Sequence, residues 1–221
     1  MEETWEFTVM SVGVPRKITS YDTLEKLGRV RLSDHFFMRD FLYSSIGDYY
    51  GLANYPENTK LAVEAGSRLC QELLEPIKKK FGHVVIRSAY RSPLVNAKGA
   101  ENGNQHGCAS NEANYARHIW DYRDSDGNMG ATACIQVHWF AEQYENGADW
   151  KSLAWWIHDH LPYSEMFFFK NRAAFNLNWR ENPVRKISSW IETPRILTKP
   201  GMDNHDGDHS EQYSWIDEKL Q

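Results

Sequence analysis

The stretch from Val84 to Asn96 gathers the residue types best suited to ligand binding in this sequence. It begins with an apolar, β-branched run, Val84–Ile86, which predicts a buried strand. Pro93 cannot donate to a strand ladder, so the strand should end before it. The polar candidates that follow are Ser88, Tyr90, Arg91 and Asn96. A guanidinium group at a strand exit can bind a carboxylate through two parallel hydrogen bonds, which predicts a carboxylate pocket here; a solvated turn is the alternative.

Helices are expected on both sides of this stretch, because apolar residues recur there with helical spacing. A stripe of residues four apart, centred on Leu69, predicts a helix from about 57 to 80 that Gly82 ends. Pro76 lies inside this pattern and should kink or loosen the last turn. A second amphipathic helix is expected over Trp150–His160.

Short apolar runs bounded by turn residues predict the remaining strands. The turn-forming run Ser125–Asn128 should separate a strand at about 117–123 from one at about 130–138. Two more strands are expected at 165–169 and 174–179. Gly, Asn and Ser dominate residues 98–114, which predicts a long loop.

These elements predict an α+β fold, a small antiparallel sheet flanked by helices, within residues 32–180. Residues 1–31 are expected to form an N-terminal extension with a short strand or hairpin, and residues 181–221 an extended C-terminal tail. The tail contains an acidic, His-rich run at 203–209, which we interpret as a polar segment rather than a metal site.

Composition excludes several classes of protein. A chain of 221 residues with 41% hydrophobic residues and nine Trp can bury a core, so it is not intrinsically disordered. The net charge of −5 disfavours nonspecific nucleic-acid binding, which usually needs a basic surface. Three Cys residues without framework spacing indicate a reducing compartment. No apolar run is long enough to cross a membrane.

Four segments together resemble the zinc D-alanyl-D-alanine carboxypeptidases, cell-wall DD-peptidases that share a fold with some phage endolysins and the hedgehog signalling domain. The run SAYRSPLVN, from Ser88 to Asn96, resembles the family signature S-G-Y-R-s-x-x-x-N. The other three segments are LSDHFFMRDFLYSS (32–45), LCQELLEPIKKKFG (69–82) and LAWWIHDHLPYSEMFFF (153–169). The resemblance implies the fold expected above, and it implies that Arg91 binds the substrate carboxylate.

In that family a His, an Asp and a second His hold zinc, and a Glu acts as general base. Two placements of the first His compete. Counting from Asn96 favours His106, but Ala113 then stands where the Asp should be. Placing it at His118 treats residues 119–129 as a hairpin insertion and aligns Gly130–Ile135 with the motif G-x-A-x-D-i. We prefer His118, because a strand must follow to complete the sheet.

With His118 in place, Cys134 occupies the Asp position and Asn176 the second His position, while the Glu position falls near Phe168 or Phe169. The predicted metal ligands are therefore His118 and Cys134, with zinc as the candidate cofactor. Neither Asn nor Phe can supply the missing functions, so hydrolysis is not expected. The residues considered as substitute ligands are His106, Asp121 and His138.

Three functional hypotheses remain open at this point. The first is a DD-peptidase-like domain without catalytic residues that binds a peptide or other small carboxylate in the former substrate groove. The second is an active zinc metallopeptidase that cleaves D-Ala-containing peptidoglycan peptides. The third is a phage-type structural or interaction module with a protein partner. The N-terminal sequence MEETWEFTVM has no signal-peptide pattern, so we expect a cytoplasmic protein or one released by lysis or with a phage particle.

Overall fold

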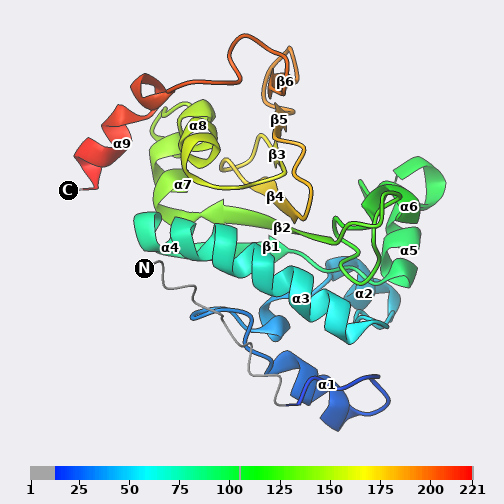
Figure 1. The fold of residues 1–221 in the computed structure, drawn as a ribbon. Coiled ribbons are helices and arrows are strands. Elements are labelled where there is room, and N and C mark those ends of the chain that lie inside the picture. The colour runs from blue at the N-terminus through cyan, green and yellow to red at the C-terminus, as the bar shows by residue number, and fades with distance from the viewer. Residues whose placement is uncertain (1–12, 105, 221) are drawn as a thin grey trace.

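The computed structural model describes residues 13–104 and 106–220 and shows an α+β fold built on a six-stranded sheet (Figure 1). The strands are β1 (Val84–Ser88), β2 (Gly130–Val137), β3 (Glu165–Phe168), β4 (Phe175–Arg180), β5 (Lys186–Ser189) and β6 (Ile196–Thr198). Their order in the sheet is β1-β2-β4-β3-β5-β6.

The sheet is mixed, which corrects the expectation of an antiparallel one. β3 and β5 pair in parallel, and the other neighbouring strands pair antiparallel. The parallel pair arises because β4 ends beside the start of β3. The short connection 181–185 then delivers β5 to the far side of β3, running in the same direction.

The two faces of the sheet differ in chemistry because side chains alternate along each strand. One face is apolar and buried; its residues include Ala131, Ala133, Ile135, Met166, Phe168, Phe175, Leu177 and Ile187. The other face is largely polar. Its register partners are Thr132 with Asn178, Cys134 with Asn176, and Glu165 with Lys186.

A long helical rod covers the apolar face and lies along the sheet in Figure 1. It consists of α3 (Thr59–Leu69), a π-helical turn (Cys70–Leu74) and α4 (Glu75–Phe81), which confirms the helix predicted over 57–80. The π turn ends at Leu74, two residues before Pro76, and the helical rod continues through the proline into α4. Leu69 is fully buried, as expected for the apolar stripe.

Two further helices complete the core. The helix expected over 150–160 is confirmed as α8 (Trp150–His160), whose Trp150 ring lies 4.8 Å from that of Phe168 on the apolar face. α7 (His138–Glu145) follows β2 directly. The shorter helices are α1 (Tyr21–Gly28), a 3₁₀ turn Met38–Phe41, α2 (Ser45–Tyr50), α5 (Pro93–Asn104), α6 (Asn111–Asn114), a 3₁₀ turn Ser210–Gln212 and α9 (Ser214–Lys219).

The connection from β1 to β2 differs from the sequence-based expectation. The strand predicted at 117–123 does not form, and α5 occupies part of the loop predicted at 98–114. The backbone at Ala116 has φ of 54°, a left-handed conformation that interrupts extended structure. Arg117 nevertheless joins β2 through one backbone hydrogen bond, from the Thr132 amide to the Arg117 carbonyl at 2.8 Å.

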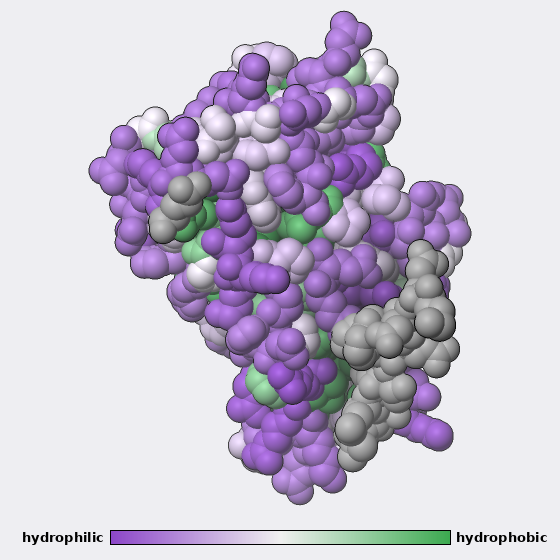
Figure 2. All heavy atoms as spheres, turned by 60° about the vertical axis from the view of Figure 1, so that its left-hand side comes forward, coloured by the Kyte–Doolittle hydropathy of each residue, from purple (hydrophilic) through white to green (hydrophobic). Residues whose placement is uncertain are grey.

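The termini also add elements to the core. Residues 1–12, where part of the hairpin was expected, lie outside the described residues, and α1 begins with a capping box between Ser20 and Thr23. β5 and β6 come from the stretch expected to be an extended tail, so the sheet continues past residue 180. Among the described residues, no helix has the length and apolar character needed to cross a membrane. The face seen in Figure 2 is mostly hydrophilic, with small hydrophobic patches.

Candidate functional site

A pocket of about 300 Å³ opens on the polar face of the sheet. Its floor comes from β2 to β5, and the segment between α6 and β2 forms one wall. The lining residues are Asn114, Arg117, His118, Thr132, Glu165, Met166, Phe167, Asn176, Asn178, Lys186 and Ser188. Such a volume matches the lower end of small-ligand pockets.

His118 is the most unusual group in this pocket. Its side chain is only 5% exposed, and Nδ1 lies 2.7 Å from the carbonyl oxygen of Ala89. A carbonyl only accepts, so Nδ1 carries the proton and Nε2 keeps a lone pair. Among the described residues Nε2 is buried without a hydrogen bond of good geometry, although the Asn176 side chain interacts with the ring. Burial, followed by the charge of Arg91, lowers the pKa of His118 well below its usual value, so the ring is neutral at pH 7.

The segment carrying His118 is held against the sheet by a strained and tightly packed turn. Ala116 adopts a left-handed conformation although it is not glycine, a strain that clusters at functional sites. Gly130 makes room for it, because a Cβ atom there would overlap with the Ala116 carbonyl oxygen. The Asn178 amide nitrogen also lies 3.2 Å from that oxygen. Sheet and turn therefore fix the positions of Arg117 and His118 together.

Charged groups surround the pocket unevenly. Arg117 pairs with Glu165 at 2.6 Å, whereas among the described residues no carboxylate pairs with Lys186. Counting Arg117 and Lys186 against Glu165, with His118 neutral, leaves an excess of one positive charge in the lining. Asn178 contributes a buried oxygen, Oδ1, that has no partner within the described part of the chain. The pocket thus offers a cation to a ligand, and two buried acceptors of its lining residues lack hydrogen bonds of good geometry.

The residues predicted to bind a carboxylate are not in the lining of this pocket. Tyr90 is fully buried and donates to Asp121 at 3.1 Å, so it braces the core and cannot touch a ligand. Arg91 is half-buried, with Nη1 at 3.0 Å from Cys108 Sγ and 3.3 Å from Asn96 Oδ1. Buried Asn96 in turn accepts from Asn114, a pocket residue, at 3.0 Å. Arg91 and Asn96 therefore support the pocket wall.

The predicted metal positions converge only in part. Cys134 and Asn176 are register partners on the polar face, Ser88 pairs with Cys134 from the other side, and Asn176 lines the pocket with His118. Burial raises the pKa of the Cys134 thiol, which therefore stays protonated at neutral pH. One imidazole, one thiol and an amide are a poor donor set for zinc, which prefers three or four thiolate, imidazole or carboxylate ligands.

The residues considered as substitute zinc ligands do not complete the donor set around His118. Asp121 is buried against Tyr90, His106 lies 3.0 Å from the Tyr50 hydroxyl, and His138 pairs with Glu142 at 3.4 Å. None of them lines the pocket that contains His118.

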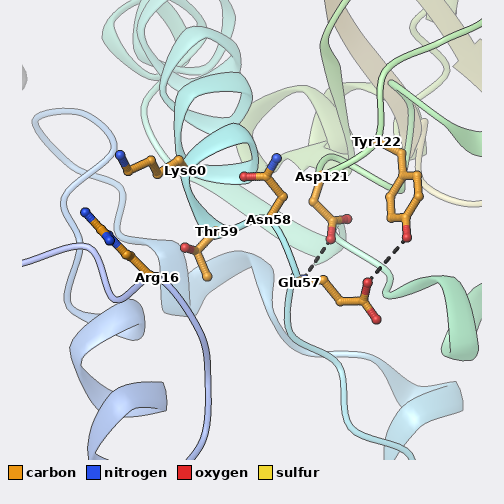
Figure 3. Close-up of a pocket in the computed structure, with 7 residues that line it drawn as sticks. All are labelled: Arg16, Glu57, Asn58, Thr59, Lys60, Asp121 and Tyr122. Atoms are coloured by element: carbon orange, nitrogen blue, oxygen red, sulfur yellow. Dashed lines mark hydrogen bonds between the residues drawn. The ribbon is translucent and has the colours of Figure 1, made fainter.

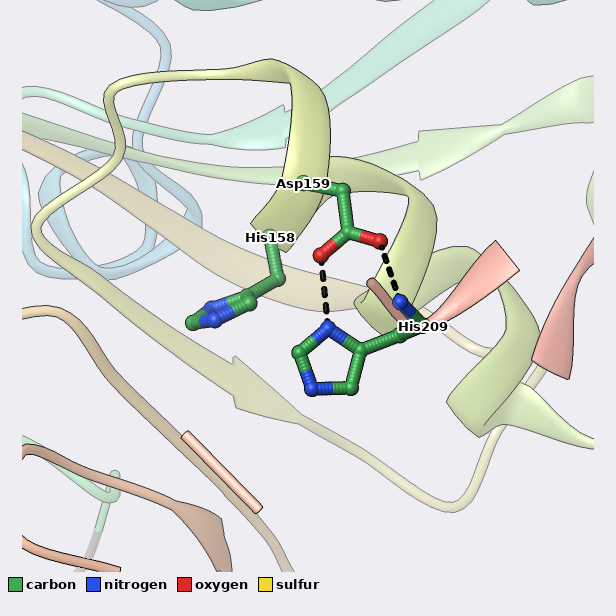
Figure 4. Close-up of side chains that lie close together, drawn as sticks. All are labelled: His158, Asp159 and His209. Carbon is green, nitrogen blue, oxygen red and sulfur yellow. Dashed lines mark hydrogen bonds and ion pairs between the residues drawn. The ribbon is translucent and has the colours of Figure 1, made fainter. Parts of the chain in front are cut away.

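One group of potential metal ligands does occur in the described residues, on α8 and the C-terminal segment (Figure 4). Ligand atoms of His158, Asp159 and His209 lie within 4.8 Å of one another. Each is already engaged: His158 contacts Tyr163 Oη at 2.6 Å and the His205 carbonyl at 2.8 Å, and His209 contacts Asp159 at 2.7 Å. In this arrangement the group holds the C-terminal segment against α8 and presents no set of free lone pairs to a metal.

A larger, more open pocket of about 600 Å³ lies at the N-terminus of α3 (Figure 3). Arg16 and Lys60 lie on one side of it and Glu57, Asp121 and Tyr122 on the other. Asp121 accepts from the Glu57 backbone amide at 2.9 Å, and the Tyr122 hydroxyl lies 3.4 Å from Glu57. Glu57, Asp121 and Tyr122 are engaged with one another, and among the described residues this pocket contains no buried polar side-chain atom that lacks a partner. The sheet-face pocket is therefore the stronger candidate site.

Comparisons with known proteins add no functional assignment: no family model, no curated protein and no solved structure matches this chain. The geometry of the sheet-face pocket therefore carries the functional argument.

The structure places His118, predicted as a metal ligand, in the pocket lining together with Arg117, Glu165 and Lys186, which sequence reasoning did not single out. A local signal did exist, since polar residues alternate with apolar ones in the β4 sequence Asn176-Leu177-Asn178. Such alternation indicates a strand with one polar face. This alternation does not predict that Lys186 of β5 lies in the same pocket as His118.

Proposed function

We propose that this chain is a binding domain, related in fold to the zinc DD-peptidases, that takes a peptide C-terminus or another small carboxylate in the sheet-face pocket without hydrolysing it. The observation that carries the proposal is the buried Nε2 of His118, which makes no hydrogen bond of good geometry, in a pocket that also contains Arg117 and Lys186. A buried acceptor without a donor costs stability, and a ligand N–H group would remove that cost.

The ligand chemistry follows from the lining. Lys186, which no described carboxylate neutralises, provides the charge for a carboxylate group, and the paired Arg117 is a second contact. His118 Nε2 and Asn178 Oδ1 accept hydrogen bonds and therefore suit backbone amides. A terminal carboxylate followed by an amide N–H is the arrangement at the end of a peptide, and a volume of about 300 Å³ suits a dipeptide-sized group.

Binding without hydrolysis is favoured by what the pocket lacks for amide cleavage. Amide hydrolysis needs an activated water and a proton acceptor. Glu165, the carboxylate in the lining, is paired with Arg117 at 2.6 Å, and this pairing opposes its use as a base. Asn176 is an amide, a poor zinc ligand, and Cys134 does not line the pocket, so the zinc that would activate the water lacks a full ligand set there.

Binding can be tested by calorimetric titration of N-acetyl-D-alanyl-D-alanine and of N-acetyl-L-alanyl-L-alanine. We expect at least one of them to bind, and Lys186→Ala to weaken that binding at least tenfold. Lys79→Ala is the matched control, because Lys79 is an exposed lysine on α4, on the other side of the sheet. Absence of binding to both peptides contradicts the proposal, and so does equal binding by the Lys186 variant.

The second candidate is an active zinc peptidase, favoured by the lone pair that neutral His118 keeps on Nε2. Metal analysis of the purified protein separates the two candidates when it is combined with an assay for D-alanine release. Zinc-dependent release that His118→Asn abolishes would replace the binding proposal with the peptidase.

A further inference from the structure

A third pocket, more open and about 740 Å³ in volume, lies at the other end of strands β3 and β5, and we call it the aromatic pocket. Its lining residues are Phe169, Lys170, Asn171, Trp190, Ile191, Glu192, Thr193 and Arg195. Trp190 is 51% exposed, an unusual state for the largest apolar side chain. Its ring lies 4.9 Å from that of Phe167 and 5.7 Å from that of Phe169, so three aromatic rings form one cluster.

This aromatic cluster is continuous with the sheet-face pocket. β3 and β5 are parallel and in register, with Glu165 beside Lys186 and Phe167 beside Ser188. Alternation therefore places Phe167, Phe169 and Trp190 on the polar face, beyond Glu165 and Lys186 along the same strands. Phe167 lines the sheet-face pocket and contacts Trp190, which lines the aromatic pocket.

We propose that the sheet-face pocket and the aromatic pocket are subsites of one elongated site. Its ligand is a peptide with an apolar or aromatic residue three to four positions before its carboxylate. This inference rests on the proposed function, because it takes the carboxylate to lie beside Lys186. At a rise of about 3.3 Å per residue, the four steps from Glu165 to Phe169 span roughly 13 Å, the length of about four extended peptide residues.

The charges of the aromatic pocket add to the positive charge of the elongated site. Lys170 and Arg195 both line the aromatic pocket, while Glu192, which also lines it, is paired with Lys151 at 2.7 Å. The groove as a whole is therefore cationic and suits a ligand with a free carboxylate. The buried acceptors His118 Nε2 and Asn178 Oδ1 add a preference for amide N–H groups, which favours a peptide over a glycan.

The experiment compares three probes by calorimetric titration: N-acetyl-D-Ala-D-Ala, N-acetyl-Gly-Gly-D-Ala-D-Ala and N-acetyl-Phe-Gly-D-Ala-D-Ala, with the L-series in parallel. We expect the Phe tetrapeptide to bind about tenfold more tightly than the Gly tetrapeptide, the scale of a good aromatic contact. Trp190→Ala should reduce this ratio to about one, and Trp190→Leu should give an intermediate ratio. Tyr49→Ala, which removes a surface ring that is 82% exposed on α2, should leave the ratio unchanged.

The outcomes separate this inference from the function on which it rests. If the dipeptide binds but the two tetrapeptides bind equally in the parent protein, the elongated site is overturned and carboxylate binding stands. If no probe binds, carboxylate binding fails and the elongated site fails with it. Tetra-N-acetylchitotetraose is the fourth probe: Trp190-dependent binding of this glycan, without discrimination between the peptides, also overturns the proposal.

Discussion

Gly130 in β2 packs so closely against Ala116 that a Cβ atom at position 130 would overlap with the Ala116 carbonyl oxygen. The same hypothetical atom would lie 2.8 Å from the Trp179 carbonyl oxygen, which is also backbone and cannot swing away. The chain segment that carries Arg117 and His118 depends on this close approach, because it contacts β2 at this point. The absence of a side chain at Gly130 therefore allows the close packing that positions the site.

We predict that Gly130→Ala lowers the free energy of unfolding by about 1–3 kcal/mol or more, the usual range for overpacking. The variant should also bind the acetylated dipeptide more weakly, because the Ala116–His118 segment must move outward. Urea unfolding followed by calorimetric titration checks both effects. A variant that is as stable as the parent would show that the two segments are not packed in this way.

A second prediction concerns the pH dependence contributed by His118. Burial lowers the pKa of this side chain in the folded protein, so below pH about 6.5 the unfolded chain binds a proton that the folded chain does not. The stability due to neutral His118 is therefore complete above pH 6.5 and falls as the pH decreases, by at most about 1.4 kcal/mol per pH unit.

His118→Asn isolates this contribution, because an Asn amide can still donate to the Ala89 carbonyl. The difference in unfolding free energy between parent and variant should shrink as the pH is lowered from 7 to 5.5. Using the difference removes contributions from other titrating groups, among them His158, whose pKa burial also lowers. A difference that is constant over this range would mean that His118 is not buried in the neutral form.

The helical rod under the sheet gives a third prediction. Leu69 is completely buried against the apolar face, so Leu69→Ala should cost about 2–5 kcal/mol of unfolding free energy. Leu94→Ala is the matched control: the same change at a side chain that is 60% exposed should cost less than about 0.5 kcal/mol. Equal losses for the two variants, measured by urea unfolding, would contradict the helix register.

The fourth prediction concerns the C-terminal segment and metals. The His209 ring stacks on Trp155 at 4.0 Å, and its Nδ1 pairs with Asp159, so this side chain fastens residues 205–216 to α8. We predict that His209→Ala accelerates amide hydrogen exchange in that segment, while treatment with EDTA leaves the exchange of the parent unchanged. Exchange that rises on EDTA treatment would instead identify His158, Asp159 and His209 as ligands of a bound metal.

The sequence alone determined the elements with strong local periodicity. The apolar stripe through Leu69 predicted the helical rod, and the amphipathic pattern predicted α8 over the residues where it occurs. The Ser125–Asn128 turn correctly predicted the start of β2 near residue 130. These successes share one reason: helix and strand periods depend on residues close in the chain, and their apolar faces are visible without knowing the partner.

Only the tertiary structure decided what lies on each face of the sheet. Tyr90 and Arg91 stand next to each other in a polar run, yet one is fully buried against Asp121 and neither lines the pocket. Lys186 joins His118 there because β5 adds in parallel beyond β3, a strand order that local periodicity does not encode. The candidate site depends on contacts between residues far apart in the chain, so its charges could be assigned only after the strands were placed.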